Sequence, residues 1–250
     1  MKLQYAISLW NFSHYPETGT LEQELGRIRE LGYGVELWAQ WHDGPGLYAE
    51  SERARLRLAL DGMPVSLHSA IVRGFDEQRK QIDAAHDLGA RVLVVHSDEF
   101  YLGDSRELDV ALCRDVVAYG EDNGVCIALE NGQLPFLEKA LAAVEGLRIC
   151  LDVGHVYLTD EPMRAFLDAL QGQIVHLHLQ DILTPAEMGL PGEWQDHYLP
   201  GTGGIPLEDW QVLAATLQEV DFDGTAVFEV RPRNPYQTTT LGRRFFDGLF

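Results

Sequence analysis

Eight short runs of apolar residues recur along the chain, and amphipathic stretches separate them. The runs cover residues 3–9, 34–37, 65–68, 92–96, 125–130, 148–152, 174–179 and 226–230. Each run is continuously apolar, which is typical of strands that are buried on both faces of a parallel sheet. The alternation of these runs with amphipathic stretches predicts βαβ units and a parallel sheet.

The stretches between the runs carry apolar residues at helical spacing. In the first of them, Leu21, Leu25 and Ile28 repeat every three or four residues, and Gly32 follows as a helix stop. The same pattern predicts helices at residues 21–31, 51–60, 75–88, 108–119, 134–144, 161–170, 207–220 and 236–250. Eight such units in 250 residues favour a closed barrel over an open sheet. We therefore predict an α/β protein with one (β/α)8 TIM barrel domain over residues 1–250.

The charge balance bears on the partners that the chain can bind. The sequence has 19 Lys and Arg against 39 Asp and Glu, a net charge of −20. Nonspecific nucleic-acid affinity comes mainly from basic side chains that neutralise phosphates, so this balance argues against nucleic acid as a partner. No run of about 18 apolar residues predicts a membrane span, and the first residues lack the layout of a signal peptide. We expect a cytoplasmic protein.

The three cysteines do not indicate a metal-binding or disulfide framework. Cys113, Cys126 and Cys150 are widely spaced and form no CxxC pair. Cys126 and Cys150 stand inside apolar runs, where a cysteine behaves as a small hydrophobic residue. We expect these two side chains to be buried.

Single polar side chains end six of the eight apolar runs. They are His68, His96, Glu130, Asp152, His178 and Glu229. In a closed barrel the C-terminal ends of the strands meet at one rim, where barrel enzymes keep their active sites. Burying several carboxylates together is costly unless a cation compensates them. We therefore predict that Glu130, Asp152, His178 and Glu229 hold a divalent metal. An oxygen-rich site with one imidazole suits Mn2+ or Mg2+, with Zn2+ and Co2+ as alternatives.

Taken one at a time, these residues have other interpretations. A carboxylate at a strand end can cap the following helix, and for Glu130 alone the two interpretations are comparable. For Asp152 the nearby His155 favours a site. His176 and His178 share one face of their strand, so one can bind the metal while the other packs or orients it.

Further candidates stand around the same rim. His68 and His96, taken singly, would fit satisfied core histidines. Glu36 ends the second apolar run and could bond a substrate hydroxyl or support a metal ligand. Arg231 is expected on the side of its strand opposite to Glu229 or in the following loop, where it could bind a carboxylate or phosphate. In the long break at residues 182–204, the glycine turn LPGTGGI has N–H groups that could bind an anion, or it is simply a tight turn.

Seven motifs follow one another in order along the chain. They are VSLHS, VVHS, ALEN, LDVGH, HLHLQD, HYLPGTGGI and FEV, between residues 65 and 230. With them the chain resembles the xylose-isomerase-like barrel superfamily of sugar isomerases, epimerases and inosose dehydratases, which also contains endonuclease IV. The resemblance covers nearly the whole chain, and it implies a (β/α)8 barrel and a metal-dependent enzyme.

The ketose 3-epimerase branch of this superfamily implies roles for single residues. Its four metal ligands match Glu130, Asp152, His178 and Glu229, and its two catalytic carboxylates match Glu130 and Glu229. In such a reaction one Glu removes the proton next to a carbonyl, and the resulting ene-diolate is reprotonated. His155 matches a histidine that contacts the substrate. The resemblance thus implies an isomerase or epimerase acting on a small ketose or polyol ketone, and an inosose-type dehydratase would share the proton abstraction.

Two departures from these patterns leave the reaction open. The epimerases place an arginine six residues after the ligand histidine, where this chain has Thr184. Endonuclease IV has a multi-zinc site that would also use His68, His96, His155 and His197, but Gln195 replaces one expected carboxylate ligand. A multi-zinc phosphodiesterase is therefore the alternative to an enzyme that acts on sugars. With either activity, the chain could form a homo-oligomer.

Overall fold

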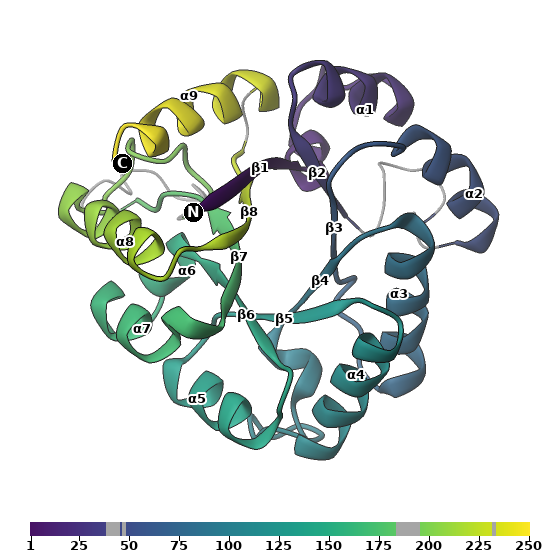
Figure 1. Ribbon diagram of the computed structural model, residues 1–250, viewed down its shortest axis with the longest axis vertical. Helices are drawn as coiled ribbons and strands as arrows, with labels where there is room; N and C mark the ends of the chain where they lie inside the picture. The colour runs from purple at the N-terminus through teal and green to yellow at the C-terminus, as the bar shows by residue number, and fades with distance from the viewer. Residues whose placement is uncertain (39–45, 47–48, 184–195, 232–233) are drawn as a thin grey trace.

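The strands of this chain close into a barrel. The computed structural model describes residues 1–38, 46, 49–183, 196–231 and 234–250. Eight parallel strands pair in chain order, and the last pairs back with the first. Helices form an outer ring around them (Figure 1). The predicted (β/α)8 barrel is confirmed.

Every predicted apolar run forms a strand. The strands are β1 (Lys2–Ser8), β2 (Gly34–Leu37), β3 (Val65–His68), β4 (Val92–Val95), β5 (Cys126–Glu130), β6 (Arg148–Asp152), β7 (Ile174–Leu179) and β8 (Asp223–Phe228). The larger helices are α1 (Leu21–Glu30), α2 (Glu50–Ala59), α3 (Phe75–Leu88), α4 (Val110–Asp122), α5 (Leu134–Ala143), α7 (Met163–Leu170), α8 (Leu207–Glu219) and α9 (Pro235–Asp247). The remaining short turns are η1 (Leu9–His14), η2 (Ser97–Phe100), α6 (Val153–Val156) and η3 (Gln171–Gln173).

The last strand differs from its predicted bounds of residues 226–230. The strand begins three residues earlier, because Asp223 and Gly224 pair with Lys2 and Leu3 of β1. The turn before the strand is made where Asp221 has a φ of 50°. As a result, Glu229 lies one residue beyond the end of β8.

Three short helical turns at the C-terminal rim of the barrel were absent from the prediction. Each of η1, η2 and α6 begins within two residues of the end of a strand, namely β1, β4 and β6. They carry the chain across the C-terminal rim of the barrel before the longer helices begin. They are too short to show apolar periodicity in the sequence.

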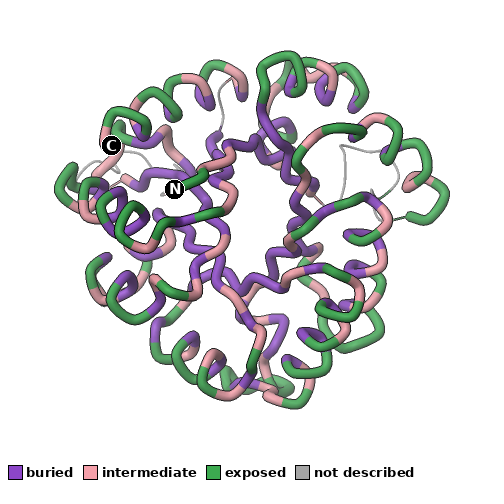
Figure 2. The backbone as a smooth tube through the Cα atoms, viewed as in Figure 1, coloured by how far each residue is buried: buried purple, intermediate pink, exposed green. Residues whose placement is uncertain are grey.

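The core has two layers. Large side chains such as Phe12, Trp210 and Phe246 are fully buried in the layer between strands and helices. A separate cluster of the small residues Val94, Ala128 and Cys150 lies within the barrel. Figure 2 shows the buried ring of strands and the exposed outer faces of the helices. Small side chains in the barrel leave room above them for a polar site at the rim.

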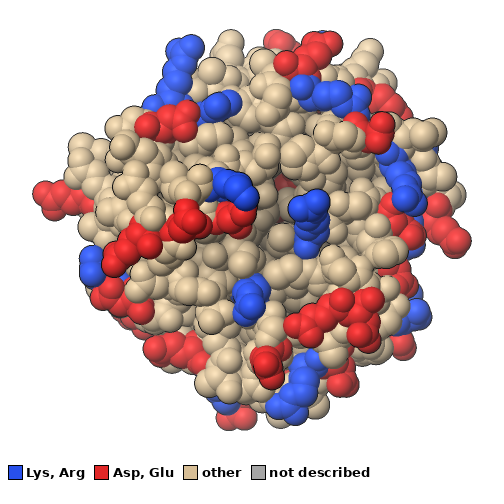
Figure 3. Space-filling model, viewed as in Figure 1, with Lys and Arg blue, Asp and Glu red and all other residues tan. Residues whose placement is uncertain are grey.

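Many charged side chains lie on the surface. Figure 3 shows acidic and basic side chains around the edge of this face, and basic side chains also nearer its centre. Within the described part of the chain, no helix is both long and apolar enough to cross a membrane.

Candidate metal centre

Four predicted metal ligands converge at the C-terminal ends of four neighbouring strands. Glu130 and Asp152 end β5 and β6, His178 lies in β7, and Glu229 follows β8. One ligand atom of each lies within 4.8 Å of the others. The structure therefore brings together the set that the strand ends predicted.

The imidazole of His178 stands at the centre of this group. Its Nδ1 lies 2.9 Å from Glu130 Oε1, 3.5 Å from Glu229 Oε2 and 3.8 Å from Asp152 Oδ2. The register of the sheet explains part of this, because Asp152 pairs directly with His178 across β6 and β7. All four side chains are buried.

The three carboxylates do not ionise alike. Burial would raise the pKa of Glu130, but the charges of His96 and His178 and the hydrogen bond from His178 hold it well below its usual value. Burial likewise opposes ionisation of Glu229, yet His178 and His197 lower its pKa to about 2. For Asp152 burial prevails and the pKa is raised. Three buried carboxylates at this spacing call for a compensating positive charge.

Asp152 is both a helix cap and a member of the cluster. Its Oδ1 accepts hydrogen bonds from the His155 N–H at 2.8 Å and from Gln180 Nε2 at 3.0 Å. The first bond caps α6. The backbone of Asp152 also bonds the side chain of Asn131 in both directions. Oδ2 accepts from Gln180 Nε2 at 2.9 Å and is the oxygen nearer His178. Capping and metal binding are thus compatible here.

Gln180 and Asn131 were missed in the sequence. Each follows a strand-end motif directly, in ALEN and HLHLQD, and this adjacency is the one signal that could have found them. Gln180 also accepts the His197 N–H at 2.5 Å, so it joins Asp152 to the segment after the long break. His197 has a φ of 65°, which is uncommon for a residue other than glycine.

A pocket of about 250 Å3 opens above the cluster. It is lined by Trp10, Trp38, His68, His96, Glu130, His155, Asp196, His197, Glu229 and Arg231. Larger hollows lie at α2 and at the N-terminal end of the barrel, but none of the predicted site residues lines them. Of these three hollows, only the pocket of about 250 Å3 is lined by the predicted site residues.

The four outer histidines contact the carboxylates of the cluster. His96 Nε2 lies 2.8 Å from Glu130 Oε2 and 3.3 Å from His68 Nε2. His155 Nδ1 lies 3.5 Å from Glu130 Oε1, and His197 Nε2 lies 3.6 Å from Glu229 Oε2. The wider ring expected from the sequence is therefore assembled around the same point.

Arg231 turns into the pocket. Its side chain is only 6% exposed, and its guanidinium lies 4.7 Å from the centre of the Trp10 ring. Its Nη2 is 3.4 Å from Asp196 Oδ1, and the same oxygen lies 2.9 Å from His197 Nδ1. Burial opposes the charge of Asp196, but the hydrogen bond from His197 lowers its pKa to about 2. Asp196 was not among the predicted residues.

Glu36 lies on the far side of His178 from the carboxylates. It has no exposed surface, and it does not line the pocket. It accepts a hydrogen bond from Ser66 Oγ at 3.0 Å and lies 2.8 Å from His176 Nε2. A fully buried side chain does not reach a substrate in the pocket, so the structure favours support of the histidines over substrate contact.

The glycine turn at residues 199–205 is occupied by a side chain of the protein. Asp181 Oδ2 accepts the Gly201 N–H at 2.9 Å, and Asp181 Oδ1 accepts the Ile205 N–H at 3.1 Å. The interpretation of these N–H groups as an anion site is therefore wrong, because a buried carboxylate already accepts them. Thr184 and Gln195, which set the departures from known patterns, lie outside the described residues.

Fold and site together define a (β/α)8 barrel with a cluster of histidines and carboxylates at its C-terminal rim. The model of the family described as xylose isomerase-like TIM barrel matches residues 25–247. The chain belongs to this family. No curated protein matches the sequence.

Solved structures share the fold at low sequence identity. A D-tagatose 3-epimerase-like protein is 19% identical with a TM-score of 0.73, covering 98% of each chain. The IolI protein with a bound zinc atom is 16% identical with a TM-score of 0.72, covering 100% of this chain and 98% of the other. A probable 3-DHS dehydratase from Bacillus anthracis is 16% identical with a TM-score of 0.66, covering 98% of each chain.

Proposed function

We propose that this chain is a divalent-metal enzyme that isomerises or epimerises a small ketose or polyol ketone. The observation that carries the proposal is the group of Glu130, Asp152, His178 and Glu229, whose ligand atoms lie within 4.8 Å of one another. Glu130 and Glu229 also line the pocket. Its volume of about 250 Å3 suits a small metabolite rather than a polymer.

The donor set fits a divalent cation. Three carboxylates and one imidazole suit Mn2+ or Mg2+, with Zn2+ and Co2+ as alternatives. The His155 N–H donates to Asp152 Oδ1 and the Gln180 amide donates to both oxygens, so the two groups hold that carboxylate in one orientation. A bound cation would supply the positive charge that acidifies a C–H next to a carbonyl.

Glu130 and Glu229 are the proposed proton carriers. One carboxylate takes the proton from the carbon next to the carbonyl, which leaves the ene-diolate of the substrate. The other returns a proton to the opposite face of that carbon, or the first returns it to the neighbouring carbon. His96 lies beside Glu130 and His197 beside Glu229, so each carboxylate has an imidazole that stabilises its charge while it is ionised.

We assign the outer residues to substrate contact or to a second metal. They are His68, His96, His155, His197 and Arg231, and each lines the pocket. Trp10 and Trp38 add aromatic surface of the kind that sugars pack against. The structural neighbours described above include an epimerase-like protein, a protein with a bound zinc atom and a probable dehydratase, and this range is compatible with the assignment.

Replacing the two carboxylates tests the mechanism. We expect Glu130→Gln and Glu229→Gln to keep the fold, because each amide is close in size to the acid it replaces, but to lose turnover by at least 100-fold. The measurement is conversion of a ketose and inosose panel with the metal restored, together with uptake of deuterium from D2O at the reacting carbon. Normal turnover in both variants would contradict the proposed mechanism. Deuterium uptake with loss of water from the substrate would mark a dehydratase.

A multi-zinc phosphodiesterase is the second candidate. Two further groups could hold ions, namely His68, His96 and Glu130, and Asp152, His155 and His197. The net charge of −20 disfavours DNA, and none of the three neighbours described above is named as a nuclease. Cleavage of an abasic-site DNA together with three tightly bound zinc ions per chain would favour this candidate.

A further inference from the structure

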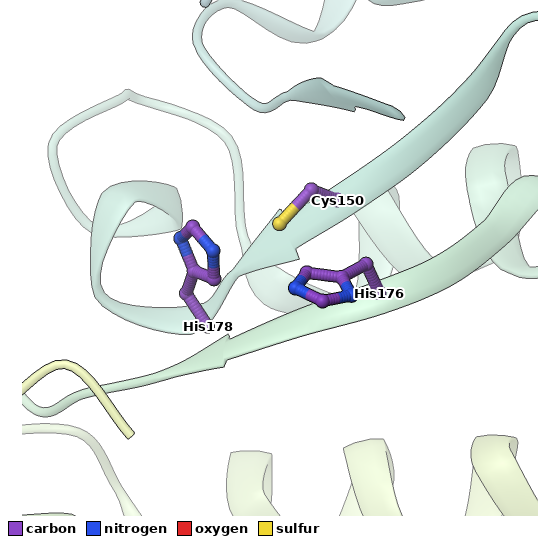
Figure 4. A group of neighbouring side chains, drawn as sticks. All are labelled: Cys150, His176 and His178. Carbon is purple, nitrogen blue, oxygen red and sulfur yellow. The ribbon is translucent and has the colours of Figure 1, made fainter. Parts of the chain in front are cut away.

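A single buried carboxylate reaches both histidines of β7. His176 and His178 project from that strand into the barrel, with Cys150 of β6 between them (Figure 4). Glu36 comes from β2 on another side of the barrel, 140 residues earlier in the chain than His176. We propose that Glu36 holds the proton of His178 on Nε2 and so presents Nδ1 to the metal. This inference rests on the proposed metal site.

The contact joins a carboxylate oxygen to a ring nitrogen in the interior of the barrel. Glu36 Oε1 and His178 Nε2 lie 3.1 Å apart as an ion pair, and both side chains are fully buried. Among the described residues, neither atom makes a regular hydrogen bond. A buried polar atom without a partner is unfavourable, so a proton on Nε2 that is shared with Oε1 satisfies both atoms.

The opposite edge of the ring faces the carboxylates. A neutral imidazole carries one proton, so its two nitrogens are one donor and one acceptor. With the proton on Nε2, the lone pair of Nδ1 points at the cluster. Without Glu36, the proton could instead sit on Nδ1 and bond Glu130 Oε1, which is 2.9 Å away. That tautomer would compete with the metal for the same lone pair.

Two neighbours hold Glu36 in place through its other oxygen. Ser66 Oγ donates to Oε2 at 3.0 Å, and His176 Nε2 lies 2.8 Å from the same atom. Oε1 is thereby left for His178. Within this proposal, His176 supports the carboxylate of Glu36, and His178 is the histidine that binds the metal.

A different use of the same side chains has to be tested. Cys150, His176 and His178 also form a group whose ligand atoms lie within 4.8 Å of one another (Figure 4). Cys150 packs with Val94 and Ala128 in an apolar cluster of the barrel and has no exposed surface. His176 Nε2 is moreover engaged by Glu36. We therefore expect Cys150 to take no part in metal binding.

Metal affinity and the histidine tautomer test the inference together. Calorimetry on metal-stripped protein would compare the wild type with Glu36→Gln, using Mn2+ and Zn2+. We expect the variant to bind about 10–100-fold more weakly, the usual effect of losing such a partner. Glu24→Gln removes another buried carboxylate, on α1, and Cys150→Ala removes the thiol. Both controls should bind as the wild type does.

Nitrogen-15 NMR of the metal-free protein, recorded at a pH high enough for the His178 ring to be neutral, gives the second readout. We expect His178 to show the Nε2–H tautomer in the wild type and a mixture of tautomers in Glu36→Gln.

Unchanged affinity and tautomer in that variant would overturn the inference, and loss of affinity in Cys150→Ala would assign the ligand to the thiol instead. If Glu36→Gln fails to fold, Ser66→Ala should shift both readouts the same way by a smaller amount, and no shift there would also overturn it. A wild type that binds no metal would defeat the proposed function, while the tautomer would still decide the role of Glu36.

Discussion

At the scale of single residues, the site depends on side chains that each serve two partners. Gln180 donates to both oxygens of Asp152 and accepts the N–H of His197. Gly154 leaves space for it, because a Cβ at that position would lie 2.5 Å from Gln180 Oε1. The glutamine therefore couples a proposed metal ligand to a pocket histidine.

Replacing Gln180 with Leu should disturb both partners. Asp152 would lose its fixed orientation, so we expect metal affinity to fall by about 10-fold or more. The buried N–H of His197 would lose its acceptor, which should lower the free energy of unfolding by about 1–3 kcal/mol. Calorimetric metal titration and urea unfolding measure the two effects.

Gln173→Leu is the matched control for this substitution. Gln173 bonds Arg148 at 2.8 Å just before β7 begins, at the opposite end of that strand. We expect it to leave metal affinity unchanged. Equal metal affinity in Gln180→Leu and the wild type would refute the coupling.

At the scale of elements, Asp181 ties the segment after the long break to the end of β7. Its carboxylate accepts the N–H groups of Ile182, Gly201 and Ile205. Gly203 must lack a side chain, because a Cβ there would lie 2.5 Å from Asp181 Oδ1. The glycines of this turn are thus required by packing against an internal carboxylate.

Asp181→Ala should loosen this segment. Three N–H groups would lose a charged acceptor, and we expect the free energy of unfolding to fall by about 2–4 kcal/mol. Asp223→Ala is the control, because its pair with Lys2 at 3.3 Å is exposed and such pairs contribute about 0–1 kcal/mol. Urea unfolding of both variants checks the difference. Equal losses in the two variants would show that Asp181 does not anchor the turn.

The sequence predicted strands better than the links between them. Continuous apolar runs are local signals, so all eight strands and the polar residues at their ends were predicted. The contact of Glu36 with His176 spans 140 residues and depends on the placement of β2 and β7 across the barrel. No local pattern carries that information. The short turns η1, η2 and α6 were missed because four to six residues show no periodicity.

At the scale of the whole molecule, the barrel gathers residues from every part of the chain at one rim. The pocket is lined by residues from Trp10 near the first strand to Arg231 beyond the last. Closure of the sheet is what makes this possible, since all strand ends then face a common centre. The position of the charged cluster is therefore a consequence of topology, and its chemistry is a consequence of which residues end each strand.

Metal binding by the cluster is the central claim, and a calorimetric titration of metal-stripped protein tests it most directly. With Mn2+ or Zn2+ we predict saturable binding of one tight ion per chain. Asp152→Ala and Glu229→Ala should abolish that binding, because each removes one of four converging ligands. Absence of saturable binding in the wild type, or binding that both variants retain, would contradict the account.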